Sequence, residues 1–305
     1  MSFFLLILGI ALLYVGGEAL VSGATGLGTR LGLSRMVVGL TVVAFGTSAP
    51  ELAATLLAAI SGVPELGVGN IVGSNIANIG LILGIAALIY ALQSTRQFLR
   101  RELPIMLIVS AALIPVFWDG YVSRLEGVLF LICLGIYLWY TLKTGSLDDE
   151  LELEESAQPL WRSLAGVLLG IALLVVGAQA LVTGATAIAR SLGVSEAVIG
   201  LTLVAFGTSL PELASSVVAA LKRETDIILG NVIGSNIFNV LAVLGLTALV
   251  SPFEQPLNLV LTDIFIMLGF GVALGLLMLR RQRLGRTGAT ALLLAYFVYV
   301  TTLFF

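Results

Sequence analysis

Two glutamates with nearly identical neighbours are the residues best suited to do chemistry in this sequence. Glu51 ends the segment GTSAPE and Glu212 ends GTSLPE, and both segments lie inside apolar runs. A threonine and a serine precede each glutamate by four and three residues, so a helix would place the three side chains on adjacent faces. A carboxylate in apolar surroundings is costly unless it is compensated. We therefore predict two equivalent ion-binding motifs, with side chains from Thr47, Ser48, Glu51, Thr208, Ser209 and Glu212.

The prolines of both motifs add backbone oxygens to this set. Pro50 and Pro211 have no N–H, so the carbonyl groups of Gly46 and Gly207 lose their helical donor, and each helix is predicted to kink there. Carboxylate, hydroxyl and carbonyl oxygens are hard ligands, which suit Na+, Ca2+ or Mg2+ better than Zn2+ or Cu+. The chain has no histidine and only one cysteine. Imidazole ligands and a disulfide framework are therefore excluded.

A second repeated motif supplies oxygen ligands without adding charge. GSNIAN covers residues 73–78 and GSNIFN covers residues 234–239. In each, the serine and the last asparagine are four residues apart, which puts them on one face of a helix. The further candidate ligands are therefore Ser74, Asn78, Ser235 and Asn239.

The composition places these motifs in a lipid bilayer. Of 305 residues, 59% are hydrophobic and 11% are charged, whereas about 25% are charged in an average soluble domain. A soluble protein would have too few charged residues to cover its surface. The net charge of −3 excludes a nucleic-acid partner. We predict an all-α polytopic membrane protein.

Charged residues and turn residues divide the chain into apolar runs. We compare the length of each run with the ~20 residues that a helix needs to cross a bilayer. Residues 103–142 contain Trp118, Asp119 and Gly120, and could form either two spans or one kinked span. Taking two, we predict ten spans, at residues 2–29, 36–59, 66–92, 103–118, 121–142, 161–189, 197–220, 227–250, 257–279 and 287–305.

The positive charges predict the orientation of these spans. If the loops alternate between two sides, one side holds 13 of the 15 lysines and arginines, and the other holds only Arg124 and Arg190. The positive-inside rule then predicts a multi-pass protein of the plasma (cell inner) membrane with both termini external. The loop at 144–160, which has six acidic residues between Asp148 and Glu155, would be cytoplasmic. It lacks the spacing of an EF-hand, which favours a solvated linker over a calcium-collecting loop.

The two halves of the chain repeat one another. Residues 31–52 and 192–213 are identical at 16 of 22 positions without a gap, and residues 69–80 match 230–241 at the same offset. The predicted domains are therefore 1–143 and 161–305, with the acidic loop between them. Because each half has an odd number of spans, the second half must enter the membrane from the opposite face. Inverted repeats are typical of secondary transporters, whose substrate site lies where the halves meet.

These motifs and their repetition resemble the alpha-repeats of the sodium/calcium exchangers, in the cation/calcium antiporter superfamily. The short central loop resembles that of the prokaryotic members. The resemblance implies that spans two, three, seven and eight form the ion-binding core and that the glycine-rich first and sixth spans slide across it. It implies that Glu51 and Glu212 bridge the calcium and sodium sites, with serine oxygens around them. It also implies backbone ligands from Ala44, Thr47, Ala205 and Thr208.

The expected activity is antiport of Na+ against Ca2+ by alternating access, without a cofactor or enzymatic chemistry. Many relatives have aspartate where this chain has Asn239, so we expect transport that does not depend on potassium. Two carboxylates carry a charge of −2, which one Ca2+ neutralises and three Na+ exceed by one, so the exchange would be electrogenic. We expect a monomer with no obligate protein partner.

Three other functions are compatible with part of the pattern. An H+/Ca2+ antiporter on the same fold is the main alternative, because buried carboxylates can take up protons. Two protons would already neutralise both carboxylates, which leaves the hydroxyl groups without a role and favours sodium. A passive cation channel is disfavoured because paired buried carboxylates bind ions too tightly. A hydrolase using Ser48 or Ser209 would lack a nearby base.

Overall fold

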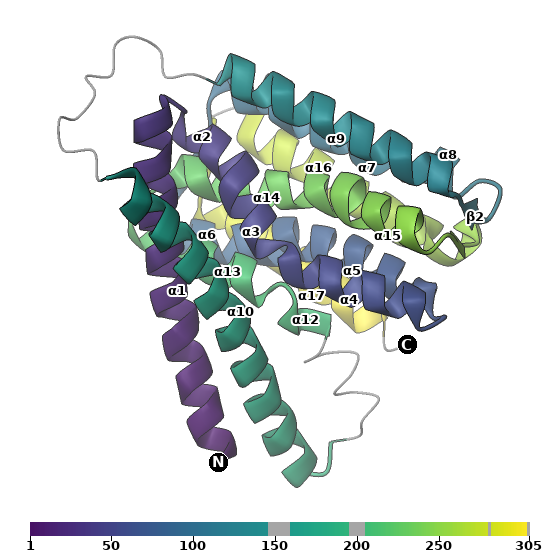
Figure 1. Cartoon of the computed structure of the whole chain (residues 1–305), viewed down its shortest axis with the longest axis horizontal. Coiled ribbons are helices and arrows are strands. Elements are labelled where there is room, and N and C mark those ends of the chain that lie inside the picture. Colours follow the sequence, from purple (N-terminus) through teal and green to yellow (C-terminus); the bar gives the residue numbers. More distant parts are fainter. Residues whose placement is uncertain (146–158, 195–204, 280–281, 304–305) are drawn as a thin grey trace.

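The computed structural model describes the whole chain except residues 146–158, 195–204, 280–281 and 304–305 (Figure 1). The acidic cluster from Asp148 to Glu155 and the start of the seventh predicted span therefore lie outside the described residues. The described part is a helical bundle with two short two-stranded ribbons.

The helices of the two halves follow the predicted spans closely. In the first half they are α1 (Ser2–Leu31), α2 (Arg35–Val38), η1 (Gly39–Val43), α3 (Ala44–Thr47), α4 (Ala49–Ile60), α5 (Pro64–Ala77), η2 (Asn78–Ile82), α6 (Leu83–Ile89), η3 (Phe98–Glu102), α7 (Leu103–Ala111), α8 (Leu113–Val116) and α9 (Arg124–Thr144). In the second they are α10 (Leu160–Ser191), α12 (Ala205–Gly207), α13 (Leu210–Leu221), α14 (Thr225–Phe238), η5 (Asn239–Leu244), α15 (Gly245–Val250), α16 (Leu257–Leu279) and α17 (Arg286–Thr302). The η segments are π-helical turns.

Six described helices, or seven with the bent pair α2–α4, are long and apolar enough to cross a membrane. The chain is therefore a membrane protein with about six to seven such helices. The remaining predicted spans are also helical, but α7 and α8 are separated at Ala112, the described α13 has 12 residues and α17 has 17. The count of ten spans stays a prediction.

Two of the long helices occupy the centre of the bundle. In Pro64–Ile89 and Thr225–Val250, 83% and 100% of the most apolar window is buried, against 22–33% in the other four long helices. Both central helices carry the GSN motifs. Because the outer helices shield them from lipid, they can carry polar side chains inside a membrane protein.

Two short ribbons join the two halves of the chain, because each pairs a strand of the first half with a strand of the second. Strand β1 (Leu92–Gln93) pairs antiparallel with β4 (Arg283–Leu284), and β2 (Tyr121–Val122) pairs with β3 (Phe253–Glu254). Strand β2 lies between α8 and α9, where Gly120 has a φ of 78°. The chain therefore turns at Trp118–Gly120, and the alternative of one kinked helix is wrong.

Helices α1 and α10 pack along their length (Figure 1). A Cβ on Gly16 would lie 2.8 Å from the backbone nitrogen of Leu174, and one on Gly170 would lie 2.5 Å from that of Leu20. The two helices are antiparallel, because residues with higher numbers in α1 contact residues with lower numbers in α10. We call this contact the glycine seam, formed by Gly9, Gly16, Gly23, Gly170, Gly177 and Gly184. Small residues of this kind allow two membrane helices to approach closely.

Candidate ion-binding site

The helix breaks predicted from the prolines bring the two glutamates into the core. Helix α3 ends at Thr47, α4 begins at Ala49, and the two segments are bent by 45°. In the second half, α12 ends at Gly207 and α13 begins at Leu210. Glu51 and Glu212 lie in the first turn after each break, and each is only 1% exposed. The kink predicted at Pro50 is confirmed, and the helix of the second half is interrupted at the corresponding position before Pro211.

The serine and glutamate of each motif bond across the repeats rather than within them. Ser48 Oγ donates to Glu212 Oε1 at 3.4 Å, and Ser209 Oγ donates to Glu51 Oε1 at 3.5 Å. The spacing within each motif suggested instead that a serine lies beside its own glutamate. These crosswise hydrogen bonds form because each helix breaks at its serine and the two breaks face one another.

The serines of the GSN motifs lie beside the hydroxyl groups of the GTS motifs. Ser209 Oγ lies 3.2 Å from Ser74 Oγ, and Thr47 Oγ1 lies 3.5 Å from Ser235 Oγ. Both GSN serines are buried. The predicted hydroxyl ligands of the four core helices therefore meet in one place.

The asparagines of the GSN motifs form a reciprocal set of bonds that we call the amide clasp. Asn78 Nδ2 donates to Asn236 Oδ1 at 2.8 Å, and Asn239 Nδ2 donates to Asn75 Oδ1 at 3.0 Å. Asn75 and Asn236 also donate to each other's backbone carbonyl groups, at 3.2 and 3.3 Å. Since the amide nitrogens of Asn78 and Asn239 are engaged, their oxygens are turned away from the clasp.

Two of the four described π-helical turns begin at asparagines of the clasp. Segment η2 begins at Asn78 and η5 begins at Asn239. A π-helical turn inserts an extra residue into the helix and redirects the side chains around it, and such turns are frequent at functional sites. The same distortion at both repeat positions points to a shared requirement for the placement of these two amides.

Four buried oxygens of this region accept no hydrogen bond from any described residue. They are Glu51 Oε2, Glu212 Oε2, Asn78 Oδ1 and Asn239 Oδ1. An unpaired buried polar atom costs about 1–3 kcal/mol. The two carboxyl groups also repel each other. Among the described residues no lysine or arginine is buried, so a cation from solution would compensate both costs.

Comparison with known proteins identifies the family. The family model described as sodium/calcium exchanger protein matches residues 1–143 and 162–305. The chain belongs to the sodium/calcium exchanger family. This is a family of transporters rather than of enzymes.

Individual relatives match over nearly their whole length. The inner membrane protein YrbG of Escherichia coli is 39% identical to this chain, over 96% of this chain and 94% of its own. The sodium/calcium exchanger MaX1 of Methanosarcina acetivorans is 32% identical, over 100% and 99% of the two chains. The solved structure of the sodium-calcium exchanger NCX_Mj, soaked with Na+ and Ca2+, has a TM-score of 0.87 at 32% identity and covers 99% of this chain and 98% of that one. The fold is therefore that of a sodium/calcium exchanger.

The predicted backbone ligands differ in their position and in the hydrogen bonds around them. The carbonyl oxygen of Ala44 accepts the Ser48 amide at 3.0 Å and lies 3.4 Å from Thr47 Oγ1. Ala205 begins the short helix α12, and Thr208 is half-buried just after it. Their roles as ligands remain predictions.

Sequence reasoning missed four asparagines that hold the predicted ligands of the exchanger in place. Asn231 Oδ1 accepts the Thr47 hydroxyl at 3.2 Å, and Asn70 Oδ1 accepts that of Thr208 at 3.1 Å. The other two are Asn75 and Asn236 of the amide clasp. All four are repeated at the common offset within GNIVGSNIAN and GNVIGSNIFN, and that repetition was a usable signal.

Proposed function

We propose that this exchanger carries Ca2+ in one direction and Na+ in the other through a single site between α4, α5, α13 and α14. The observation that carries this proposal is the set of four unpaired buried oxygens around Glu51 and Glu212. Carboxylate, amide and hydroxyl oxygens are the ligands that Ca2+ takes in proteins. The remaining predicted ligands, Thr47, Ser48, Thr208, Ser209, Ser74 and Ser235, would complete the coordination as the ions change.

The charge of the site supports an electrogenic exchange. Two carboxylates without a cationic partner among the described residues are neutralised by one Ca2+, whereas three Na+ leave one positive charge. Na+ and Ca2+ differ in charge and in their demand for ligands, so both can use one set of oxygens in different numbers. Because Asn78 and Asn239 are both neutral, potassium would find no third carboxylate here, and the exchange would not depend on it.

Proton coupling is the second candidate function. Protons could neutralise Glu51 and Glu212, but the oxygens of Asn78 and Asn239 are poor bases that do not take up protons near neutral pH. These amide oxygens would bind Ca2+ with either coupling ion, but a coupling proton would leave them buried and unpaired in the calcium-free half of the cycle. Sodium ions would use the same oxygens in both halves of the cycle, which favours sodium coupling.

Calcium uptake into proteoliposomes is expected to follow a sodium gradient rather than a proton gradient. Radioactive Ca2+ would be measured with an outward Na+ gradient, an outward H+ gradient and an outward K+ gradient in parallel. Uptake with Na+ alone, accompanied by a change in membrane potential, is the expected result. Uptake that occurs only with the H+ gradient would reject sodium coupling and support the alternative.

We also propose ten spans arranged as two inverted halves. The antiparallel glycine seam supports this, because Gly9, Gly16 and Gly23 of α1 meet the helix that corresponds to α1 in the second half. The ribbons support it too, since each joins loops that alternation puts on the same side of the membrane. The charge distribution then favours external termini and a cytoplasmic central loop in the plasma membrane.

The substitution Asn75→Ala is expected to raise the KM for Ca2+ with little change in the maximal rate. Without Asn75 Oδ1, the Asn239 amide loses the bond that turns its oxygen toward the site, at a cost of about 1–3 kcal/mol. At 1.4 kcal/mol per tenfold, this corresponds to an increase in KM of about 5–150-fold. Calcium-dependent uptake rates in proteoliposomes would measure it.

A double-mutant cycle distinguishes this positioning role from general destabilisation. If Asn75 acts through Asn239, adding Asn75→Ala to Asn239→Ala should raise the KM no further. Multiplying effects in the double variant would show that Asn75 does not position Asn239. The thermal unfolding midpoint of each variant reports any loss of stability separately.

A further inference from the structure

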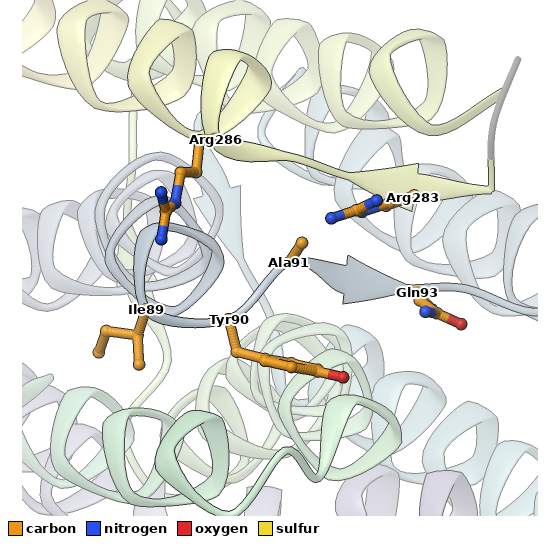
Figure 2. Close-up of a pocket in the computed structure, with 6 residues that line it drawn as sticks. All are labelled: Ile89, Tyr90, Ala91, Gln93, Arg283 and Arg286. Carbon is orange, nitrogen blue, oxygen red and sulfur yellow. The ribbon is translucent and has the colours of Figure 1, made fainter.

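A cavity lined by two arginines contains none of the candidate ligands of the ion site. It has a volume of about 490 Å3 and is lined by Ile89, Tyr90, Ala91, Gln93, Arg283 and Arg286 (Figure 2). Pockets of ~300–1,000 Å3 are typical of small-molecule sites. None of these six described residues is acidic.

The β1–β4 ribbon brings the walls of this cavity together from the two halves of the chain. Gln93 pairs with Arg283 in the ribbon, and Ser94 N–H donates to the Gln282 carbonyl group at 2.7 Å beside it. In Figure 2 the Arg283 side chain extends from β4 toward Ala91, and Arg286 extends from the start of α17 toward the end of α6. Both guanidinium groups therefore face the same space.

Positive charge accumulates at this cavity without a neutralising ion pair among the residues that the structure describes. Neither Arg283 nor Arg286 takes part in the ion pairs found among the described residues. Arg223 adds a third charge, since its guanidinium carbon lies 5.6 Å from the centre of the Tyr90 ring. Arg286 also begins the 17-residue helix α17, whose N-cap Gly285 offers no capping side chain. The free amides of this first turn attract anions as well.

The cavity lies at the predicted boundary between the membrane and the water. Helix α6 ends at Ile89, which is 39% exposed, and α17 begins at Arg286, so the cavity lies where two predicted spans meet the water. The cavity lies on the side of the protein that holds most of the arginines, and the charge distribution predicts that this side is cytoplasmic. Anionic lipids give the cytoplasmic leaflet a negative surface potential, and basic pockets between membrane helices on that side bind lipid headgroups.

We propose that this cavity binds the phosphate group of an anionic phospholipid. Arg283 and Arg286 would hold the phosphate oxygens by paired N–H donors, which guanidinium groups present in a planar fork. Tyr90 and Gln93 would contact the glycerol and headgroup, and the apolar Ile89 would face the acyl chains. Because the ribbon joins the loop after the third predicted span to the loop before the tenth, a bound lipid would also stabilise the contact between the halves.

The thermal unfolding midpoint of the full-length protein in neutral detergent tests this site. Wild-type protein would be titrated with short-chain phosphatidylglycerol, short-chain phosphatidylcholine and inorganic phosphate, since a ligand that binds the folded state raises the midpoint. We expect phosphatidylglycerol alone to raise it. An equal rise with inorganic phosphate at the same concentration would overturn the lipid as the source of the phosphate group.

Matched variants locate the binding. A basic residue near the surface contributes about fivefold to anionic lipid binding, so Arg283→Gln with Arg286→Gln should weaken phosphatidylglycerol binding about 25-fold. The control, Arg100→Gln with Arg162→Gln, removes the same charge from exposed positions at the same predicted end. Equal weakening in both pairs would overturn the proposal.

A further substitution keeps both arginines and adds a negative charge that would repel the phosphate group. Gln93→Glu places a negative charge at the exposed wall of the cavity. We expect it to weaken phosphatidylglycerol binding by about fivefold or more while the midpoint without lipid stays near that of the wild type. Unchanged lipid binding would overturn the proposal, because a like charge at the site must repel a phosphate group.

Discussion

Replacing Glu51 or Glu212 with glutamine is expected to abolish calcium transport while the protein remains folded. Each carboxylate is buried, each approaches the serine of the other repeat, and each has one oxygen free of hydrogen bonds from the described residues. Glutamine keeps the shape and one oxygen but removes the charge, so one Ca2+ would leave the site with a net positive charge in a region of low dielectric.

The size of this effect follows from the loss of one charge in a desolvated cluster. Removing one partner of a buried charge pair costs about 3–5 kcal/mol, which is about 10²-fold to 4 × 10³-fold in binding at 1.4 kcal/mol per tenfold. Initial rates of radioactive Ca2+ uptake into proteoliposomes driven by a Na+ gradient would measure it. Because the cross-repeat bonds make the two sites equivalent, both single variants should fall by a similar factor.

A matched control separates the charge at the site from the charge of the whole protein. Glu65→Gln makes the same substitution at an exposed position in the first turn of α5, and its transport should equal that of the wild type. Size-exclusion profiles and thermal midpoints would show that the variants fold. Wild-type uptake from either Glu51→Gln or Glu212→Gln would contradict the site assignment.

Adding a single methyl group to the glycine seam is expected to impair both stability and transport. In Gly170→Ala the new Cβ would lie 2.5 Å from the Leu20 nitrogen and 2.8 Å from the Gly16 carbonyl oxygen. These are backbone atoms, so α1 and α10 must separate. Forcing extra volume into a packed contact typically costs about 1–3 kcal/mol, and we expect the free energy of unfolding to fall by that amount.

The expected loss of transport comes from the proposed movement of α1 and α10. If they slide across the core together, strain of 1–3 kcal/mol that falls on one of the two access states shifts their ratio by about 5–150-fold. The control is Gly135→Ala in α9, where a Cβ meets nothing within 4 Å and helix propensity favours alanine. Equal thermal midpoints and uptake rates for Gly170→Ala and Gly135→Ala would show that close packing at the seam is not required.

Glu18 shows how the structure decides a role that the sequence leaves open. From its place in the first span, Glu18 could either line an ion path or reach outward from the helix. In the structure Glu18 lies 2.6 Å from Lys222 Nζ, which also donates to Ser22 Oγ at 2.9 Å. The side chain is partly exposed and lies away from the buried carboxylates, so it belongs to an ion pair between α1 and the end of α13.

The membrane environment, the repeated segments and the candidate oxygen ligands all follow from the order of the residues. These properties depend on composition and on local spacing, which are fully contained in the order of the residues. The proline at each GTS-x-PE motif predicted a kink because the absence of an N–H acts on the same helix. Repetition at one offset also singled out Glu51 and Glu212 from all other acidic residues.

Which residues bond to one another follows from the packing of the helices and not from the local sequence. The bonds from Ser48 to Glu212 and from Asn78 to Asn236 join residues more than 150 positions apart, and no local period encodes them. The orientation of the clasp amides depends on partners from the other half, and the glycine seam depends on how closely two distant backbones approach. The arginine cavity likewise exists only because a ribbon joins two loops from opposite halves. Such contacts arise when independently formed helices pack, because packing chooses among many pairings that the local sequence permits equally.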